Sequence, residues 1–141
     1  LDGSHEWEKF TDAISPNIFE YAESIKNADY LLDYDCPWIN YYENGDFQEV
    51  HHHMRKNNVF SYAYFYRLPK NSGDFYFVND MGKNLYLGNT SKTFKTCSEQ
   101  FFPKVEEKSL IIFPSWLSHG VSPNRTNEVR ITISGNVTLV E

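Results

Sequence analysis

The sequence predicts a mainly β fold, a double-stranded β-helix (jelly roll) with helices at its N-terminal side. From Pro37 onward the chain is a succession of short runs rich in aromatic and β-branched residues, interrupted by Gly, Asn, Asp and Pro. Many short strands at this spacing are typical of an antiparallel sandwich or barrel, not of alternating strands and helices. The 141 residues suit one packed domain. We therefore expect a helical part over residues 1–35 and a jelly-roll core over residues 36–141.

The expected helices lie in the first third of the chain. Residues 6–13 form a short amphipathic segment. Ser15 and Pro16 then provide an N-cap followed by proline at the first helical position, which predicts the start of a second helix. Beyond that start, three apolar residues recur at helical spacing, namely Ile18, Ala22 and Ile25.

The expected strands follow from Pro37 in chain order. The runs WINYY and FQEVHHH flank the turn ENGD, and the long run VFSYAYFYRLP is separated from FYFV by KNSGD. The later runs are NLYLG, KSLIIF, LSHGV and EVRITISGNVTLV. The stretch from Asn79 to Lys95 is polar, and we expect it to form a lid over a site in the jelly roll.

Composition excludes some classes of partner. The net charge is −6, and the basic residues do not gather into the cationic stripe that nucleic-acid binding requires. No apolar run reaches membrane-spanning length. We therefore expect neither a nucleic-acid nor a membrane partner. The two cysteines, Cys36 and Cys97, do not make a disulfide framework and are interpreted as free thiols in a reducing cytoplasm.

Three consecutive histidines end the run FQEVHHH. If this run is a strand, His51 and His53 share one face and His52 points the opposite way. Two imidazoles at alternate strand positions can offer two ligands to one metal ion. The alternative is a polar strand end with solvated histidines.

A fourth histidine favours the metal hypothesis. His119 follows the apolar run LIIF and Pro114, where we expect a buried strand to end and a short strand to begin. A third imidazole there would complete a facial set of ligands, which suits non-haem Fe(II) and oxygen chemistry. The alternative is a core histidine held by a backbone carbonyl.

Arg130 lies 11 residues beyond His119 within the alternating run EVRITISGNV. One face of that strand is apolar, and the other carries Arg130 together with Thr132. A guanidinium inside a small barrel needs a partner, and a bidentate carboxylate would provide one, with the hydroxyl of Thr132 adding a hydrogen bond. The alternative is a polar face that water solvates.

These motifs resemble the Fe(II)- and 2-oxoglutarate-dependent oxygenases. The segments GDFQEVHHH, SYAYFYRLPKNSGDFYF, LIIFPSWLSHGVSPN and VRITISGNV are similar to a branch of this superfamily found in bacteria and their phages. The resemblance covers about Trp38 to Val137. It implies Fe(II), 2-oxoglutarate and O2 as cofactor and cosubstrates, and a cytoplasmic protein of a bacterium or of a phage in its host.

The resemblance also implies roles for single residues. His51 and His119 become the first and distal iron ligands, and Arg130 binds the far carboxylate of 2-oxoglutarate with Thr132 beside it. The middle ligand departs from the commonest form of the superfamily, because His53 stands where Asp or Glu is usual. Three carboxylates could supply the ligand instead but lack the usual spacing, namely Asp46, Glu49 and Asp74.

Further contacts to 2-oxoglutarate are expected from residues beside these motifs. Asn40 shares a face with Tyr42 just before the histidine strand, and Asn136 lies six residues past Arg130. The long run VFSYAYFYRLP places three tyrosines on one face, of which Tyr64 is the expected contact. An aromatic ladder of this kind is also typical of core packing.

The function implied is a dioxygenase that hydroxylates a small molecule, a peptide or a protein. Compact members of the superfamily include prolyl hydroxylases, so a prolyl residue is the first substrate to consider. Two alternatives are a cupin-like three-histidine dioxygenase that does not use 2-oxoglutarate and a non-catalytic jelly-roll binding module. The sequence does not predict the oligomeric state.

Overall fold

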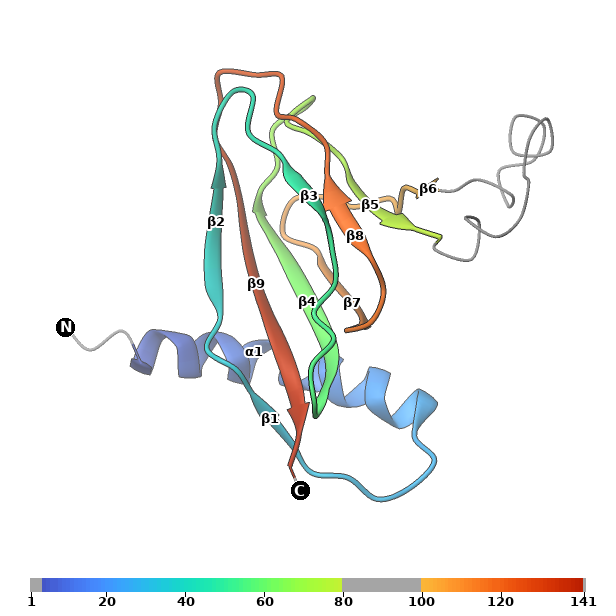
Figure 1. The fold of residues 1–141 in the computed structure, drawn as a ribbon. Helices are drawn as coiled ribbons and strands as arrows, with labels where there is room; N and C mark the ends of the chain where they lie inside the picture. Colours follow the sequence, from blue (N-terminus) through green and yellow to red (C-terminus); the bar gives the residue numbers. More distant parts are fainter. Residues whose placement is uncertain (1–3, 80–99, 141) are drawn as a thin grey trace.

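The computed structural model describes residues 4–79 and 100–140. Figure 1 shows one long helix and two antiparallel sheets that face each other. The elements in chain order are α1 (Ser4–Ile25), β1 (Leu32–Tyr34), β2 (Trp38–Tyr42), β3 (Gln48–His51), β4 (Asn58–Arg67), β5 (Phe75–Val78), β6 (Gln100–Phe101), β7 (Leu110–Pro114), β8 (His119–Val121) and β9 (Arg130–Leu139). The predicted mainly β jelly roll is confirmed. The expected lid, Asn79 to Lys95, falls outside the described residues except for Asn79, as does Cys97.

The larger sheet has the order β1-β9-β4-β7, and β2 pairs with β9 on the same side as β1. The smaller sheet has the order β3-β8-β5-β6. Strand β9 is central to the larger sheet because β4 pairs along one of its edges while β1 and β2 share the other. Its register sets Tyr42 opposite Arg130 and Asn40 opposite Thr132. The polar residues of β2 and β9 therefore lie next to each other, between the two sheets.

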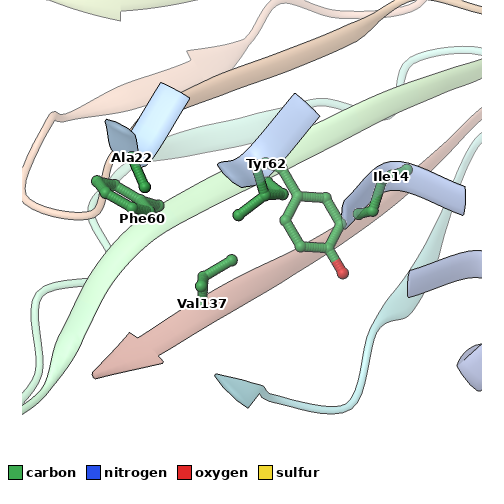
Figure 2. Close-up of a cluster of buried hydrophobic side chains, with 6 residues drawn as sticks. Ile14, Ala22, Phe60, Tyr62 and Val137 are labelled. Atoms are coloured by element: carbon green, nitrogen blue, oxygen red, sulfur yellow. The ribbon is translucent and has the colours of Figure 1, made fainter. Parts of the chain in front are cut away.

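The helix packs on the outer face of the larger sheet. Three residues of α1 are buried there against side chains of β4 and β9, as Figure 2 shows. They are Ile14, Ile18 and Ala22, and their partners are Phe60, Tyr62 and Val137. The aromatic ring of Tyr62 also covers Gly135, where an added Cβ would lie 2.2 Å from the phenol oxygen. A larger residue at position 135 would thus displace the ring against the helix.

The expectation of two N-terminal segments separated at Ser15 is wrong. One helix runs from Ser4 to Ile25 with Pro16 inside it. Pro16 and Asp12, whose carbonyl loses its helical partner at the proline, both lie on the exposed face, where water can solvate that carbonyl. The hydroxyl of Ser15 donates to the carbonyl of Thr11 at 2.7 Å and does not cap a helix start. The buried apolar face continues past the proline without interruption.

A second core fills the space between the sheets. Its buried members are Tyr42, Ala63, Phe65, Phe75, Phe113 and Val121. Within residues 4–79 and 100–140, no helix combines the length and apolar character that a membrane crossing requires. Cys36 is a free thiol on the surface.

Candidate metal centre and cosubstrate cavity

Three histidines from two strands and a loop converge between the sheets. His51 ends β3 and is paired in register with His119 at the start of β8. His53 lies just beyond β3, where its backbone N–H donates to the carbonyl of Ser115 at 2.8 Å. One ligand atom of each of the three imidazoles lies within 4.8 Å of the others, as one metal ion would require. His52 points away and is exposed, as strand alternation predicts.

Hydrogen bonds to backbone carbonyls orient two of these rings. Nδ1 of His51 lies 2.8 Å from the carbonyl oxygen of Glu49, and Nδ1 of His119 lies 2.9 Å from that of Leu117. A ring that donates from Nδ1 to a carbonyl keeps the lone pair of Nε2 free for a metal ion. The ring of Phe113 packs against His119 with the centroids 4.7 Å apart, and Trp38 packs against His53 at 5.7 Å. These contacts fix where the imidazoles point.

The surroundings favour the neutral form of His53 and His119. Burial lowers the pKa of His119 to about 4, against the opposing effect of its hydrogen bond to Leu117. Burial, with a smaller contribution from the positive charge of Arg55, also lowers the pKa of His53 to about 4. Because neutral imidazole is the form that binds a metal ion, these residues are ready ligands near pH 7. The donor set fits a divalent transition metal such as Fe(II).

The metal-free protein should lose stability as the pH is lowered from about 6.5 towards 4. Folding lowers the pKa of His53 and His119 from 6.5 to about 4, so the unfolded chain takes up these protons first. For the buried His119 the loss approaches about 1.4 kcal/mol per pH unit, and solvent screening makes it smaller for the half-buried His53. Urea unfolding at pH 7, 6 and 5, in the presence of a metal chelator, measures this loss of stability. His53→Gln should flatten the dependence and His52→Gln should not; equal slopes in all three proteins would contradict the assignment.

Arg130 lies in the same cavity, fully buried. Its Nη1 donates to the carbonyl of Gly73 at 2.6 Å, while its Nε and Nη2 have no hydrogen-bond partner among the described residues. The rings of Tyr42 and Phe65 lie on the guanidinium, each with its centroid 5.6 Å from Cζ. Burial lowers the pKa of Arg130, but a guanidinium stays charged in proteins. Two unpaired donors on a buried cation fit a carboxylate, which accepts both at once.

A polar wall connects Arg130 with the histidines. Nδ2 of Asn40 donates to Oγ1 of Thr132 at 3.3 Å and to Oγ of Ser134 at 3.1 Å. Tyr42, Asn40 and Trp38 follow one another along the inner face of β2, opposite Arg130, Thr132 and Ser134 of β9. Burial raises the pKa of the Tyr42 phenol, so it is a neutral donor. Tyr42 and Ser134 line the cavity but were not among the predicted site residues, although strand alternation from Asn40 and Thr132 would have found them.

Two of the predicted cosubstrate contacts do not reach this cavity. Tyr64 lies on the face of β4 that meets the helix, with its ring 5.8 Å from that of Phe10, while Ala63 and Phe65 face the cavity. The expected contact of Tyr64 with 2-oxoglutarate is therefore corrected. Asn136 is buried and its Oδ1 accepts from Ser61 at 2.8 Å, outside the cavity lining. The rejected carboxylates of Asp46, Glu49 and Asp74 are all exposed.

Comparison with known proteins is decisive for the family. Residues 36–136 match the family described as "Putative 2OG-Fe(II) oxygenase", in which 2OG is 2-oxoglutarate. The chain belongs to this family. The name of the family implies Fe(II) and 2-oxoglutarate, and the three histidines and Arg130 have the chemistry to hold these groups. No curated protein matches the sequence.

Solved structures share the fold of this oxygenase at low sequence identity. A prolyl-4-hydroxylase from Pseudomonas putida is 12% identical with a TM-score of 0.63, over 94% of this chain and 65% of that protein. The viral collagen prolyl hydroxylase of Paramecium Bursaria Chlorella virus-1 is 14% identical with a TM-score of 0.61, over 94% and 74%. The non-heme alpha ketoglutarate dependent epimerase SnoN from nogalamycin biosynthesis is 15% identical with a TM-score of 0.64, over 92% and 55%. The chain thus spans between 55% and 74% of these proteins.

Proposed function

We propose that this oxygenase is a hydroxylase in which His51, His53 and His119 hold Fe(II) and Arg130 anchors 2-oxoglutarate. One observation carries the proposal. A fully buried guanidinium, two of whose donors have no partner among the described residues, lies in the same cavity as three converging imidazoles. A three-histidine dioxygenase that does not use 2-oxoglutarate would have no use for Arg130, and a binding module would have no use for the oriented imidazoles.

Different residues would bind the metal and 2-oxoglutarate at the two ends of the cavity. At one end, the carbonyls of Glu49 and Leu117 accept from Nδ1 of His51 and His119, so that Nε2 of each would be free to hold the metal. At the other end, Nε and Nη2 of Arg130 pair with the far carboxylate of 2-oxoglutarate. Bound Fe(II) supplies the activation of O2, coupled to the oxidative decarboxylation of 2-oxoglutarate to succinate and CO2.

Aromatic side chains exclude water from the histidine end. Phe75 stacks on His119 with the centroids 5.6 Å apart, and Phe113 meets both rings. A site closed in this way protects reactive species from water and strengthens the electrostatic contacts inside it. Along the wall between the two ends, the Tyr42 phenol and the hydroxyl of Thr132 are placed to donate to a 2-oxoglutarate carboxylate.

The substrate we propose first is a prolyl residue of a peptide or protein. Two of the structures that share the fold are named prolyl hydroxylases, whereas a third is named an epimerase. The test is succinate release in air from the Fe(II)-loaded protein, with proline-containing peptides and with matched peptides that carry alanine instead. We expect succinate release that the proline peptides stimulate; equal release with both would exclude the prolyl substrate, and no 2-oxoglutarate consumption at all would exclude the hydroxylase.

Replacing Tyr42 by phenylalanine should raise the concentration of 2-oxoglutarate needed for half-maximal decarboxylation by about 10-fold or more. The reason is that a hydrogen bond to a charged group is worth about 1.5–3 kcal/mol. Tyr64→Phe is the matched control, because Tyr64 lies on the opposite face of the sheet. Its requirement should stay within about twofold of the unmodified protein. A larger effect of Tyr64→Phe than of Tyr42→Phe would reverse the assignment.

A further inference from the structure

The cavity contains no carboxylate among the described residues that line it. Arg130 is the charged group among these lining residues, because the three histidines are neutral as metal ligands. The negative charge of Asp74 raises the pKa of Arg130 slightly against the effect of burial. Asp74 is exposed and lies outside the cavity, however, where water screens its charge. The described residues therefore supply no carboxylate to the cavity beside the metal centre.

The site would carry a surplus of positive charge when Fe(II) and 2-oxoglutarate are both bound. The divalent ion and Arg130 bring three positive charges, and the two carboxylates of 2-oxoglutarate bring two negative ones. With a carboxylate in place of His53, the net charge of these groups would be zero. With His53, one net positive charge remains in a largely buried cavity. A buried charge without a partner is costly, so the surplus favours a further anion.

A second positive group lies at the edge of the centre. Arg55 lies two residues beyond His53, in the loop between β3 and β4. Arg55 is exposed and therefore accessible to a ligand that approaches from solvent. Its charge adds to the surplus and favours an anion on the side of the cavity where His53 lies.

We propose that this cavity binds a carboxylate-sized monoanion beside the metal together with 2-oxoglutarate, and that the substrate carries this negative charge. For a prolyl substrate, the group would be the free carboxylate of a terminal proline or an acidic neighbour. The inference rests on the proposed function, because it requires both the metal and 2-oxoglutarate in the cavity. His53 is the residue that creates the surplus, since a carboxylate at this position would remove it.

The test uses the protein loaded with Co(II), whose ligand preferences are close to those of Fe(II) and whose visible absorbance reports its ligands. The Co(II) protein is first saturated with 2-oxoglutarate and then titrated with sodium azide or, separately, with sodium acetate. We expect both anions to change the spectrum, with half-saturation at a concentration about tenfold or more below that of the His53→Asp protein. Arg55→Gln should weaken both anions by a smaller factor.

Asn40→Asp is a second variant that adds a negative charge to the same cavity and leaves the three histidines in place. It should also weaken azide and acetate by about tenfold, which keeps the test valid if His53→Asp does not fold. If the unmodified protein, His53→Asp and Asn40→Asp bound the anions with equal affinity, the inference would be overturned. If the unmodified protein bound azide but not acetate, a substrate that carries a carboxylate would be excluded. If 2-oxoglutarate itself leaves the Co(II) spectrum unchanged, the proposed function fails instead.

Discussion

Replacing His119 by alanine should abolish iron-dependent turnover of 2-oxoglutarate and lower the affinity for Fe(II) by at least about 100-fold. Loss of a residue that merely orients a metal ligand already costs about 10–100-fold, and His119 is itself a proposed ligand. It is buried, faces His51 across the β3–β8 pair, and its Nδ1 is held by the carbonyl of Leu117. The variant leaves two imidazoles, and water must replace the third.

His52→Ala is the matched control for this experiment. It removes an imidazole between the two proposed ligands of the same strand end, but one that is exposed and points away from the cavity. Iron content after anaerobic loading, 2-oxoglutarate consumption and the circular dichroism spectrum should all match the unmodified protein. Full iron occupancy in a folded His119→Ala protein would show that the three histidines do not form the centre.

Replacing Arg130 by methionine should have two opposite effects. The concentration of 2-oxoglutarate required for decarboxylation should rise by about 100-fold, because removing one partner of a buried charge pair costs about 2–5 kcal/mol. The free energy of unfolding of the metal-free protein should rise by about 1–4 kcal/mol, because methionine removes a buried charge whose Nε and Nη2 are unpaired. The residue proposed to anchor the cosubstrate would thus destabilise the fold that contains it.

Arg67→Met controls for the loss of an arginine. Arg67 is paired with Glu128 at 3.1 Å on the surface, and an exposed ion pair contributes little to stability. Both the free energy of unfolding and the 2-oxoglutarate requirement should stay near those of the unmodified protein. If Arg130→Met left the 2-oxoglutarate dependence unchanged, Arg130 would not bind the cosubstrate. If it strongly destabilised the metal-free protein, the orphaned guanidinium would have partners that the structure does not show.

Strand alternation is the part of this site that can be predicted from sequence. It places Arg130 and Thr132 on one face of β9, because the rule involves neighbours in one strand. It also separates His51 and His53 from His52, although β3 ends at His51 and His53 lies in the loop beyond it. The meeting of His119 with His51 depends on pairing between distant strands, and the sequence could only suggest it through the motif spacing. The carboxylate-free cavity follows from the same motif, in which His53 replaces the usual acid.

The choice of face on β4 could not be predicted in the same way. Its tyrosines alternate with Ser61, Ala63 and Phe65, and both faces of the strand are buried, one under α1 and one between the sheets. Alternation says which residues share a face, but only the position of the helix decides that Tyr64 lies outside the cavity. The extent of α1 could not be predicted from sequence for a similar reason. Pro16 indicates the start of a helix unless it is known to lie on the exposed face of a longer one.

The most direct test of a shared site for Fe(II) and 2-oxoglutarate is an anaerobic titration of 2-oxoglutarate into the Fe(II)-loaded protein. Chelation of the metal by the keto acid creates a visible charge-transfer band. We expect this band to appear and to saturate at one equivalent of 2-oxoglutarate. It should require a much higher 2-oxoglutarate concentration in Arg130→Met and be absent in His119→Ala. A protein that binds Fe(II) but develops no band at any 2-oxoglutarate concentration would contradict a shared site.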